Sequence, residues 1–315
     1  MSSLSSAEIQ RVSSNYAIDP IGPVGVNQQG ITNETIELGN EHFLTIFKWR
    51  DTTELEAIAY AANSLSPDVP LVRPIMGENG YVFETDGGPA LLTPRIAGKH
   101  YVGINQLDKK PIPSEIHPSL ARSFWALQLG LSDVPENVKR VLLPAREIPD
   151  QHSRTDLPDY VQPLLRLKPS DLSRYHMPVY GDLVHDDMER QNVLSVGSEV
   201  TGIVDLDSLM VGDVLYQFGH FVFNFAFCDP NADLETADPY LEELEKAEVI
   251  LPKDVPAIYP HIYDFVLNDL AEIEILKAHS GLDDERAIDL EALCLQYQDA
   301  LNLARRFFNH HYKAV

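Results

Sequence analysis

The pattern of apolar and polar positions divides the first hundred residues into a helix and short strands. Residues 53–65 (TELEAIAYAANSL) place apolar side chains such as Leu55 and Ile58 on one face, at the spacing of an amphipathic helix. Short apolar runs flank two turn sequences, Gly-Asn at residues 39–40 and Asp-Gly-Gly at residues 86–88. Gly and Asn tolerate the positive φ angles of tight hairpin turns, so both places predict antiparallel strand pairs.

Hydroxyl side chains ahead of two helical segments indicate where those helices begin. Ser5 or Ser6 is expected to cap a helix over residues 6–15, because a side-chain oxygen can accept from the exposed amides of the first turn. For the same reason Thr52 or Thr53 is expected to cap the amphipathic helix described above. A small sheet combined with helices is therefore predicted for this part of the chain.

From about residue 113 onward most segments are longer and have helical periodicity. The predicted helices cover residues 114–129, 156–167, 212–227, 236–248, 257–279 and 284–311. Strand-like sequence interrupts them between residues 178 and 205. We therefore predict an α+β protein with a small antiparallel-sheet N-lobe (residues 1–95) and a larger, mostly helical C-lobe (residues 96–315).

Composition indicates a globular protein with a sizeable core and a strong negative charge. The 315 residues are 44% hydrophobic and carry a formal net charge of −24, with a sequence pI of about 4.7. Phosphate groups attract Lys and Arg, so neither nucleic acid nor an anionic membrane is expected as a partner. No apolar run approaches ~18 residues and no secretory pattern opens the chain, so a cytoplasmic location is expected. The acidity either favours a cationic substrate or serves solubility.

The strand-like stretch contains the residues that point to chemistry. The run VHDDMERQNVL reads H-x-D-x-x-x-x-N from His185 through Asp187 to Asn192, and a short hairpin then leads to Asp205. Phosphoryl transfer needs a carboxylate that accepts the proton of the attacking hydroxyl, together with oxygen ligands for Mg²⁺. Asp187 and Asn192 have a spacing that suits these roles, and Asp205 can return beside Asn192 across the hairpin.

This run resembles the catalytic region of the aminoglycoside phosphotransferase and choline kinase superfamily of small-molecule kinases. The segment LVHDDMERQNVLSVGSEVTGIVDLDSLMVGDVLYQFG carries the likeness, and HFLTIF and VPLVRPI are similar to type II homoserine kinases. The resemblance implies a bilobal, protein-kinase-like fold with ATP and Mg²⁺ as cofactors. It also implies that Asp187 is the catalytic base and that His185 braces the loop. Asn192, Asp205 and Asp207 are the implied metal ligands.

Three further acids near the motif receive other roles. Asp182 lies on the incoming strand and is expected to be structural, and Asp186 has the wrong spacing for the base. Asp213 is expected to cap the following helix.

In the N-lobe the resemblance assigns nucleotide contacts with several alternatives. Kinases carry a basic residue on the third strand and pair it with a helix glutamate. Here the strand position is Thr45, and Lys48 three residues later is either a phosphate contact or a solvated surface residue. Glu56 is the candidate helix acid, with Glu54 as its rival.

Two connecting segments complete the expected nucleotide site. In NQQGITNE, residues 27–34, Gly30 lets the backbone approach phosphate and Asn33 can donate from its side chain, although a plain turn is the alternative. The segment that joins the lobes offers Thr93 and Arg95 beside the base of the nucleotide.

The chain is therefore expected to be an ATP- and Mg²⁺-dependent phosphotransferase. Its acceptor is the hydroxyl of a small molecule, such as an amino alcohol, a sugar or an aminoglycoside-like compound, and it is expected to act as a monomer or homodimer. Because Thr45 is uncharged, a pseudokinase or nucleotide-binding regulatory protein is an alternative. The run VDLDSL leaves a protein Ser/Thr kinase of the stress-response type as another.

Overall fold

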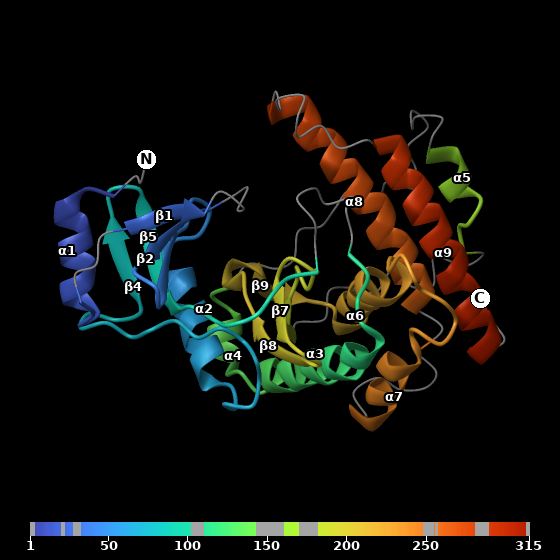
Figure 1. Ribbon diagram of the computed structural model, residues 1–315, viewed down its shortest axis with the longest axis horizontal. Helices are drawn as coiled ribbons and strands as arrows, with labels where there is room; N and C mark the ends of the chain where they lie inside the picture. The colour runs from blue at the N-terminus through green and yellow to red at the C-terminus, as the bar shows by residue number, and fades with distance from the viewer. Residues whose placement is uncertain are drawn as a thin grey trace.

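The computed structural model of the chain has a sheet-containing lobe at one end and a helical lobe at the other (Figure 1). It describes residues 4–19, 23–27, 33–101, 110–142, 161–169, 182–247, 255, 258–280 and 290–312. This is the predicted α+β arrangement of a small antiparallel sheet followed by a larger, mostly helical lobe.

Five antiparallel strands form the N-lobe sheet in the order β1-β2-β3-β5-β4. Their bounds are β1 (Pro23–Asn27), β2 (Glu34–Leu38), β3 (His42–Ile46), β4 (Val82–Thr85) and β5 (Gly88–Pro94). Both hairpins lie where the turn sequences predicted them, and Gly39 takes the positive φ, 64°, that such turns need. The strand β1 was not predicted, because its Gly and Pro content hides the strand pattern.

Alternation along the strands gives the sheet two different faces. Ile36, Leu44 and Leu92 are buried on one face, where they pack with α1 (Ser6–Asn15). Leu91 points to the opposite face and belongs to the large core that includes the C-lobe. The second face is therefore the one turned toward the rest of the molecule.

The two N-lobe helices begin at capping boxes. Ser5 caps α1 as predicted, its hydroxyl accepting an amide of the first turn. The helix α2 (Thr52–Ser64) is capped by Asp51 and not by the threonines that were predicted. The Asp51 carboxylate accepts the amide of Glu54 at 2.9 Å, and Glu54 returns by accepting the amide of Asp51 at 3.1 Å. This reciprocal pair satisfies two amides that the helix itself leaves without partners.

Helices make up most of the C-lobe, as predicted. They are α3 (His117–Ser132), α4 (Glu136–Lys139), α5 (Gln162–Leu165), α6 (Val214–Val222), α7 (Asp238–Ala247), α8 (Ile258–Ser280) and α9 (Leu290–Tyr312). Short 3-10 turns lie at Ser114–Ile116 and Leu206–Ser208. The predicted helical residues 156–160 and 284–289 lie outside the described part of the chain.

The helix α6 has a defined start and an unusual end. Asp213 caps it, as predicted, by accepting the amides of Leu215 and Tyr216 at 2.7 and 3.2 Å. At its C-terminal end it continues into a π-helical turn, η6 (Phe223–Phe227). There the amide of Cys228 donates to a carbonyl five residues back, at 2.8 Å, which is the spacing of a π-helix.

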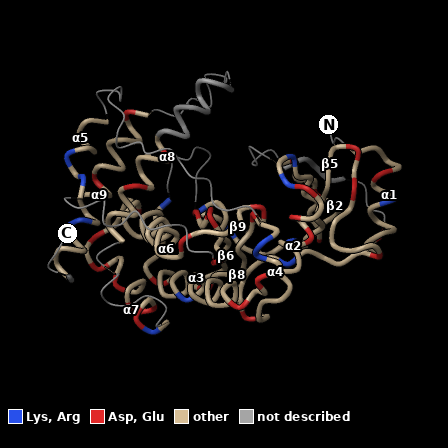
Figure 2. The backbone as a smooth tube through the Cα atoms, turned by 180° about the vertical axis from the view of Figure 1, so that it is seen from behind, with Lys and Arg blue, Asp and Glu red and all other residues tan. Residues whose placement is uncertain are grey.

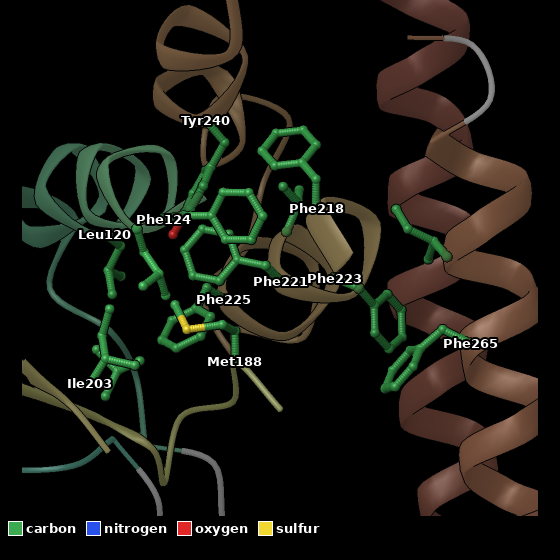
Figure 3. Packing of buried hydrophobic residues seen from close by; sticks show 14 of the residues in the cluster. Leu120, Phe124, Met188, Ile203, Phe218, Phe221, Phe223, Phe225, Tyr240 and Phe265 are labelled. Carbon is green, nitrogen blue, oxygen red and sulfur yellow. The ribbon is translucent and has the colours of Figure 1, made fainter. Parts of the chain in front are cut away.

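Aromatic side chains from this segment fill the core of the C-lobe (Figure 3). Phe221 stacks on Phe124 of α3 with ring centroids 4.7 Å apart. Phe223 instead meets Phe265 of α8, with centroids 6.0 Å apart. The segment is therefore fixed between two neighbouring helices by side chains that point in different directions.

Two short ladders frame the loop that carries the motif. β6 (Asp182–His185) pairs with β9 (Leu209–Gly212), and β7 (Val193–Val196) pairs with β8 (Glu199–Ile203). The β7–β8 hairpin turns at Gly197, where φ is 60°. The strand β9 was not predicted, since its four residues run directly into the apolar pattern of the next helix.

Acidic residues are spread over both lobes (Figure 2), in keeping with the net charge of −24.

The longest described helices, α8 and α9, have 23 residues each. None of the helices in the described part of the chain is long and apolar enough to cross a membrane.

Candidate active site

The loop between β6 and β7 holds Asp187 and Asn192 side by side. Nδ2 of Asn192 donates to Oδ2 of Asp187 at 2.8 Å and to the backbone carbonyl of the same residue at 2.9 Å. Met188, between them in sequence, is buried in the aromatic core and anchors the loop (Figure 3). The five-residue spacing thus closes into a hydrogen-bonded turn in which Asn192 fixes the direction of the Asp187 carboxylate.

Asp205 reaches the same place from the end of β8. The amide of Val204 donates to the carbonyl of Asn192 at 2.9 Å, which brings the two segments together. Asp205 has a left-handed backbone, with φ 71° and ψ 58°, which is uncommon for residues other than glycine. Ser208 supports it by donating from its hydroxyl to the Asp205 carboxylate and from its amide to the Asp205 carbonyl, both at 3.1 Å. Residues in such strained conformations cluster at functional sites.

His185 connects β6 to the segment before Asp205. Its Nε2 donates to the carbonyl of Val204 at 2.9 Å. Burial lowers the pKa of His185, so the ring is neutral at neutral pH. The neighbouring Asp186 is occupied elsewhere, because its carboxylate accepts from the side-chain amide of Gln217 on α6.

Several buried carboxylates crowd this site. Burial, followed by the charges of Glu189 and Asp205, raises the pKa of Asp187 well above its ordinary range, while the hydrogen bond from Asn192 acts in the opposite direction. Burial, followed by the charge of Asp205, raises the pKa of Asp207 to about 7. Carboxylates that share a small space repel each other unless a proton or a cation lies between them.

The side chains present fit Mg²⁺. Oδ1 of Asp207 is buried and has no hydrogen-bond partner among the described residues. Since Asn192 donates through Nδ2, its Oδ1 is not used in the hydrogen bond to Asp187 and could bind a cation. The described residues contain no cluster of three or more His, Cys, Asp and Glu that could hold a metal alone. Mg²⁺ does not require one, because it commonly takes one or two carboxylates and completes its shell with substrate phosphates and water.

Two side chains of the N-lobe reach the turn that follows Asp205. Nδ2 of Asn33 donates to Oδ2 of Asp207 at 2.6 Å. Arg50 donates from Nη2 to the carbonyl of Asp207 at 2.7 Å, and its Nη1 forms an ion pair with Glu54 at 3.1 Å. Asn33, predicted to approach phosphate, therefore contacts a candidate metal ligand of the other lobe.

Other candidates for nucleotide contact lie on the interior strands of the sheet and directly after the end of β5. The Thr45 hydroxyl is 3.3 Å from that of a threonine on β2, and Thr93 lies on the adjacent strand β5. Arg95 forms an ion pair with Glu37 at 3.1 Å. Gly30 lies outside the described residues.

Lys48 and Glu56 do not lie with the residues of the motif. Lys48 is exposed. The Glu56 carboxylate accepts a hydrogen bond from the backbone amide of Val82 on β4 at 2.8 Å, so it connects α2 to the sheet. Glu54, the other acid considered on α2, forms an ion pair with Arg50. That partner, Arg50, was missed, although its spacing of four residues from Glu54 is a visible helix-pair signal.

Arg190 is a second residue that sequence reasoning missed. It lies within the loop between β6 and β7, yet its side chain is only 2% exposed. Nε donates to the carbonyl of Asn224 at 2.8 Å, Nη1 donates to the carbonyl of Lys110 at 2.9 Å, and Nη2 lies 3.5 Å from Asp229. These partners come from distant segments, so no local pattern marks the residue.

Solved structures share this fold across nearly the whole chain. One is amicoumacin kinase hAmiN in complex with AMP-PNP, Ca²⁺ and Ami, with a TM-score of 0.65 and 14% identity over 94% of this chain and 92% of that chain. Another is the GDP and kanamycin complex of APH(2")-IIia, with a TM-score of 0.61 and 16% identity over 95% and 99%. A third is spectinomycin phosphotransferase APH(9)-Ia with ADP and spectinomycin, with a TM-score of 0.61 and 13% identity over 97% and 99%. At these identities the likeness shows the fold, and the predicted bilobal, kinase-like fold is confirmed.

Sequence comparison gives the family. No curated protein matches the sequence significantly. The profile of the phosphotransferase enzyme family matches residues 27–250, which is more than half of the chain and includes the whole motif. The predicted family and class of enzyme are thereby confirmed. The chain belongs to the phosphotransferase enzyme family.

Proposed function

We propose that this phosphotransferase uses ATP and Mg²⁺ to phosphorylate a hydroxyl group of a small molecule. The observation that carries the proposal is the 2.8 Å hydrogen bond from Asn192 to Asp187. It joins Asp187, the candidate proton acceptor, to the side-chain amide of Asn192. The oxygen of that amide, together with Asp205, can bind a cation. A base in contact with a metal site is what phosphoryl transfer from a nucleotide requires.

In this mechanism Asp187 accepts the proton of the acceptor hydroxyl as that oxygen bonds to the γ-phosphorus of ATP, while the bond from this phosphorus to the β,γ-bridging oxygen breaks and ADP leaves with the electron pair. Asn192 keeps the carboxylate oriented, and burial, which raises the pKa of Asp187, makes this carboxylate a stronger proton acceptor than an exposed one. Asn192, Asp205 and Asp207 would hold Mg²⁺, which would neutralise charge on the transferring phosphoryl group. His185 contributes by fixing the backbone just before Asp205.

The surroundings of Asp187 on the C-lobe side support an acceptor that carries a positive charge. Oε1 of Glu189 lies 3.4 Å from Nε2 of His220, and the His220 ring stacks on Phe265 with centroids 3.7 Å apart. The charges of Glu189 and Asp186 both act on Asp187, so the surroundings of this carboxylate are acidic, which favours a cation. Amino alcohols and aminoglycosides offer both a hydroxyl and an amine. Some structural neighbours are complexes with kanamycin, spectinomycin or hygromycin B, so these compounds open the panel to be tested.

A protein that binds nucleotide without transferring phosphate is the second candidate. Thr45 places no cation on β3, and Lys48, the nearby alternative, is exposed. The same experiment separates the two candidates.

The test measures transfer of labelled γ-phosphate from Mg²⁺-ATP to a panel of amino alcohols, sugars and aminoglycosides. Asp187→Asn is expected to lower turnover about 10²- to 10⁴-fold, the usual contribution of a general base, while ATP still raises the unfolding temperature. Asp205→Asn is expected to weaken binding of the Mg²⁺ complex of ATP, because it alters a metal ligand. Asp182→Asn is the control, since that carboxylate pairs with Lys139 at 3.0 Å and should affect neither quantity.

The outcomes are distinct. The proposal is refuted if the wild type phosphorylates no acceptor and nucleotide does not raise its unfolding temperature. Stabilisation by ATP without transfer to any acceptor would favour the second candidate. Loss of ATP binding in Asp187→Asn would mean that the roles of base and metal ligand are exchanged.

A further inference from the structure

Arg50 connects the start of α2 to the turn that follows Asp205. Its side chain is only 9% exposed. Nη1 forms the ion pair with Glu54 at 3.1 Å, whereas Nη2 donates to the carbonyls of Asp207 at 2.7 Å and Leu209 at 3.3 Å. One buried guanidinium therefore holds an N-lobe helix and a C-lobe turn at the same time.

The geometry of these contacts suits arginine and not lysine. A guanidinium presents its N–H donors in a rigid plane, so one nitrogen can face a carboxylate while another faces two carbonyls. A lysine ammonium carries its three donors on one nitrogen and lacks the planar fork that divides these contacts between two nitrogens. A buried cation is stable only where partners compensate its lost hydration, and Arg50 has three such partners.

The turn that Arg50 holds contains the strained residue of the site. The left-handed backbone of Asp205, with φ 71°, persists only where surrounding contacts over-determine it. Asn33 fixes the carboxylate of Asp207 through the 2.6 Å hydrogen bond, and Arg50 fixes the backbone of that same residue. The N-lobe thus holds both the carboxylate and the backbone of Asp207, two residues after Asp205 in the same turn, while Ser208 of that turn holds the Asp205 carboxylate.

We infer that Arg50, oriented by Glu54, is a positioning residue that keeps Asp205 and Asp207 directed at one cation. The inference rests on the proposed function, because the cation is the Mg²⁺ of the proposed reaction. Protein kinases pair a helix glutamate with a lysine on strand β3. Here the helix glutamate pairs with Arg50, which lies beyond the strand and acts on the metal-binding turn.

The test compares metal binding by three variants with that of the wild type. Arg50→Met removes the cation, and Arg50→Lys keeps the charge without the planar fork. Glu54→Gln removes the carboxylate charge, while glutamine still serves at the third position of a capping box. Arg140→Met is the matched control, because Arg140 pairs with Glu136 at the same i,i+4 spacing but is 77% exposed.

Three quantities are measured for each protein. The first is the dissociation constant of Mn²⁺ in the presence of AMP-PNP, followed by electron paramagnetic resonance, since Mn²⁺ takes the same octahedral oxygen ligands as Mg²⁺. The second is the dissociation constant of AMP-PNP in EDTA. The third is the unfolding temperature without ligand, which reports a purely structural role.

Arg50→Met is expected to weaken Mn²⁺ binding about 10- to 100-fold, as is usual for residues that orient metal ligands, with AMP-PNP binding in EDTA unchanged. Arg50→Lys and Glu54→Gln are expected to show smaller losses, and Arg140→Met none. Unchanged Mn²⁺ binding by Arg50→Met would overturn the inference, and so would a lower unfolding temperature without a change in metal affinity.

The result also separates this inference from the proposed function. If the wild type binds Mn²⁺ and the variants lose it as expected, but no acceptor is phosphorylated, the inference stands and the proposed function fails. If the wild type phosphorylates an acceptor while the variants bind Mn²⁺ normally, the proposed function stands and the inference fails. A wild type that binds no Mn²⁺ with AMP-PNP overturns both.

Discussion

Replacing Arg190 by methionine would remove a buried cation from the candidate catalytic loop. The guanidinium donates to the carbonyls of Asn224 and Lys110 at 2.8 and 2.9 Å, and it faces Asp229 at 3.5 Å. Methionine keeps much of the apolar stem but none of the donors. The variant therefore leaves two carbonyls and one carboxylate in the interior without this partner.

The expected loss of stability follows from what remains in the variant. Removing one member of a buried ion pair costs about 3–5 kcal/mol, because the other charge is left uncompensated. Asp229 keeps the amides of Ile112 at 2.7 Å and Asn231 at 2.8 Å as donors, which places the cost near the lower end, at about 3 kcal/mol. Because 1 kcal/mol corresponds to about 2–4 °C for a unit of 150–250 residues, the unfolding temperature should fall by about 6–12 °C.

Thermal unfolding of the wild type, Arg190→Met, Asp229→Asn and the double variant measures this loss. Both changes act on one network, so the double variant should lose less than the sum of the single losses, by about 0.5–3 kcal/mol. Turnover by Arg190→Met should also fall, since a displacement of about 1 Å at a catalytic group can cost about 10²-fold. A fall of less than about 2 °C in Arg190→Met, or strictly additive losses, would refute the reasoning.

Two further changes test the core and the first helix cap. Phe221→Ala should cost about 3–5 kcal/mol in denaturant unfolding, because the side chain is fully buried against Phe124; a loss below ~1 kcal/mol would contradict that packing. The amide of Asp86 and then the amide and hydroxyl of Ser5 donate to Glu8 and lower its pKa. Because the folded value lies below the unfolded one, this stabilisation is complete above the unfolded pKa and is lost as pH falls through the folded pKa. The difference in unfolding temperature between the wild type and Glu8→Gln should therefore be larger at about pH 7 than at about pH 3.5, and a difference that does not depend on pH would exclude this role.

The elements that could be predicted from the sequence are those with a local cause. The hairpins, the cap at Ser5 and the cap at Asp213 depend on residues that can be read in order along the chain. The strand β9 owes its existence to β6, a partner elsewhere in the chain, and has no alternation of its own. Asp51 was overlooked although aspartate followed three residues later by glutamate is a capping-box pattern, because the adjacent threonines are also good caps.

The candidate site divides in the same way. Asp187 and Asn192 lie on one loop, and a single hairpin leads back from that loop to Asp205. The spacing of these residues in the sequence was therefore enough to predict that they lie close together. The contacts of Arg50 with the carbonyl of Asp207 join residues 157 positions apart. Such contacts depend on how the lobes meet, which no periodicity in a single sequence encodes.

The π-helical turn η6 offers one last consequence. An extra residue in a helical turn advances every later side chain by about 100° around the axis. Aromatic rings before and after the π-helical turn accordingly pack on different helices: Phe221 packs on α3 and Phe227 packs on α9. The backbone carbonyl of Asn224, within the same turn, accepts the hydrogen bond from Nε of Arg190. Deleting a single residue there would rotate the later aromatic side chains away from their neighbours and also remove an anchor of the candidate catalytic loop. This short segment therefore has little freedom to change in length.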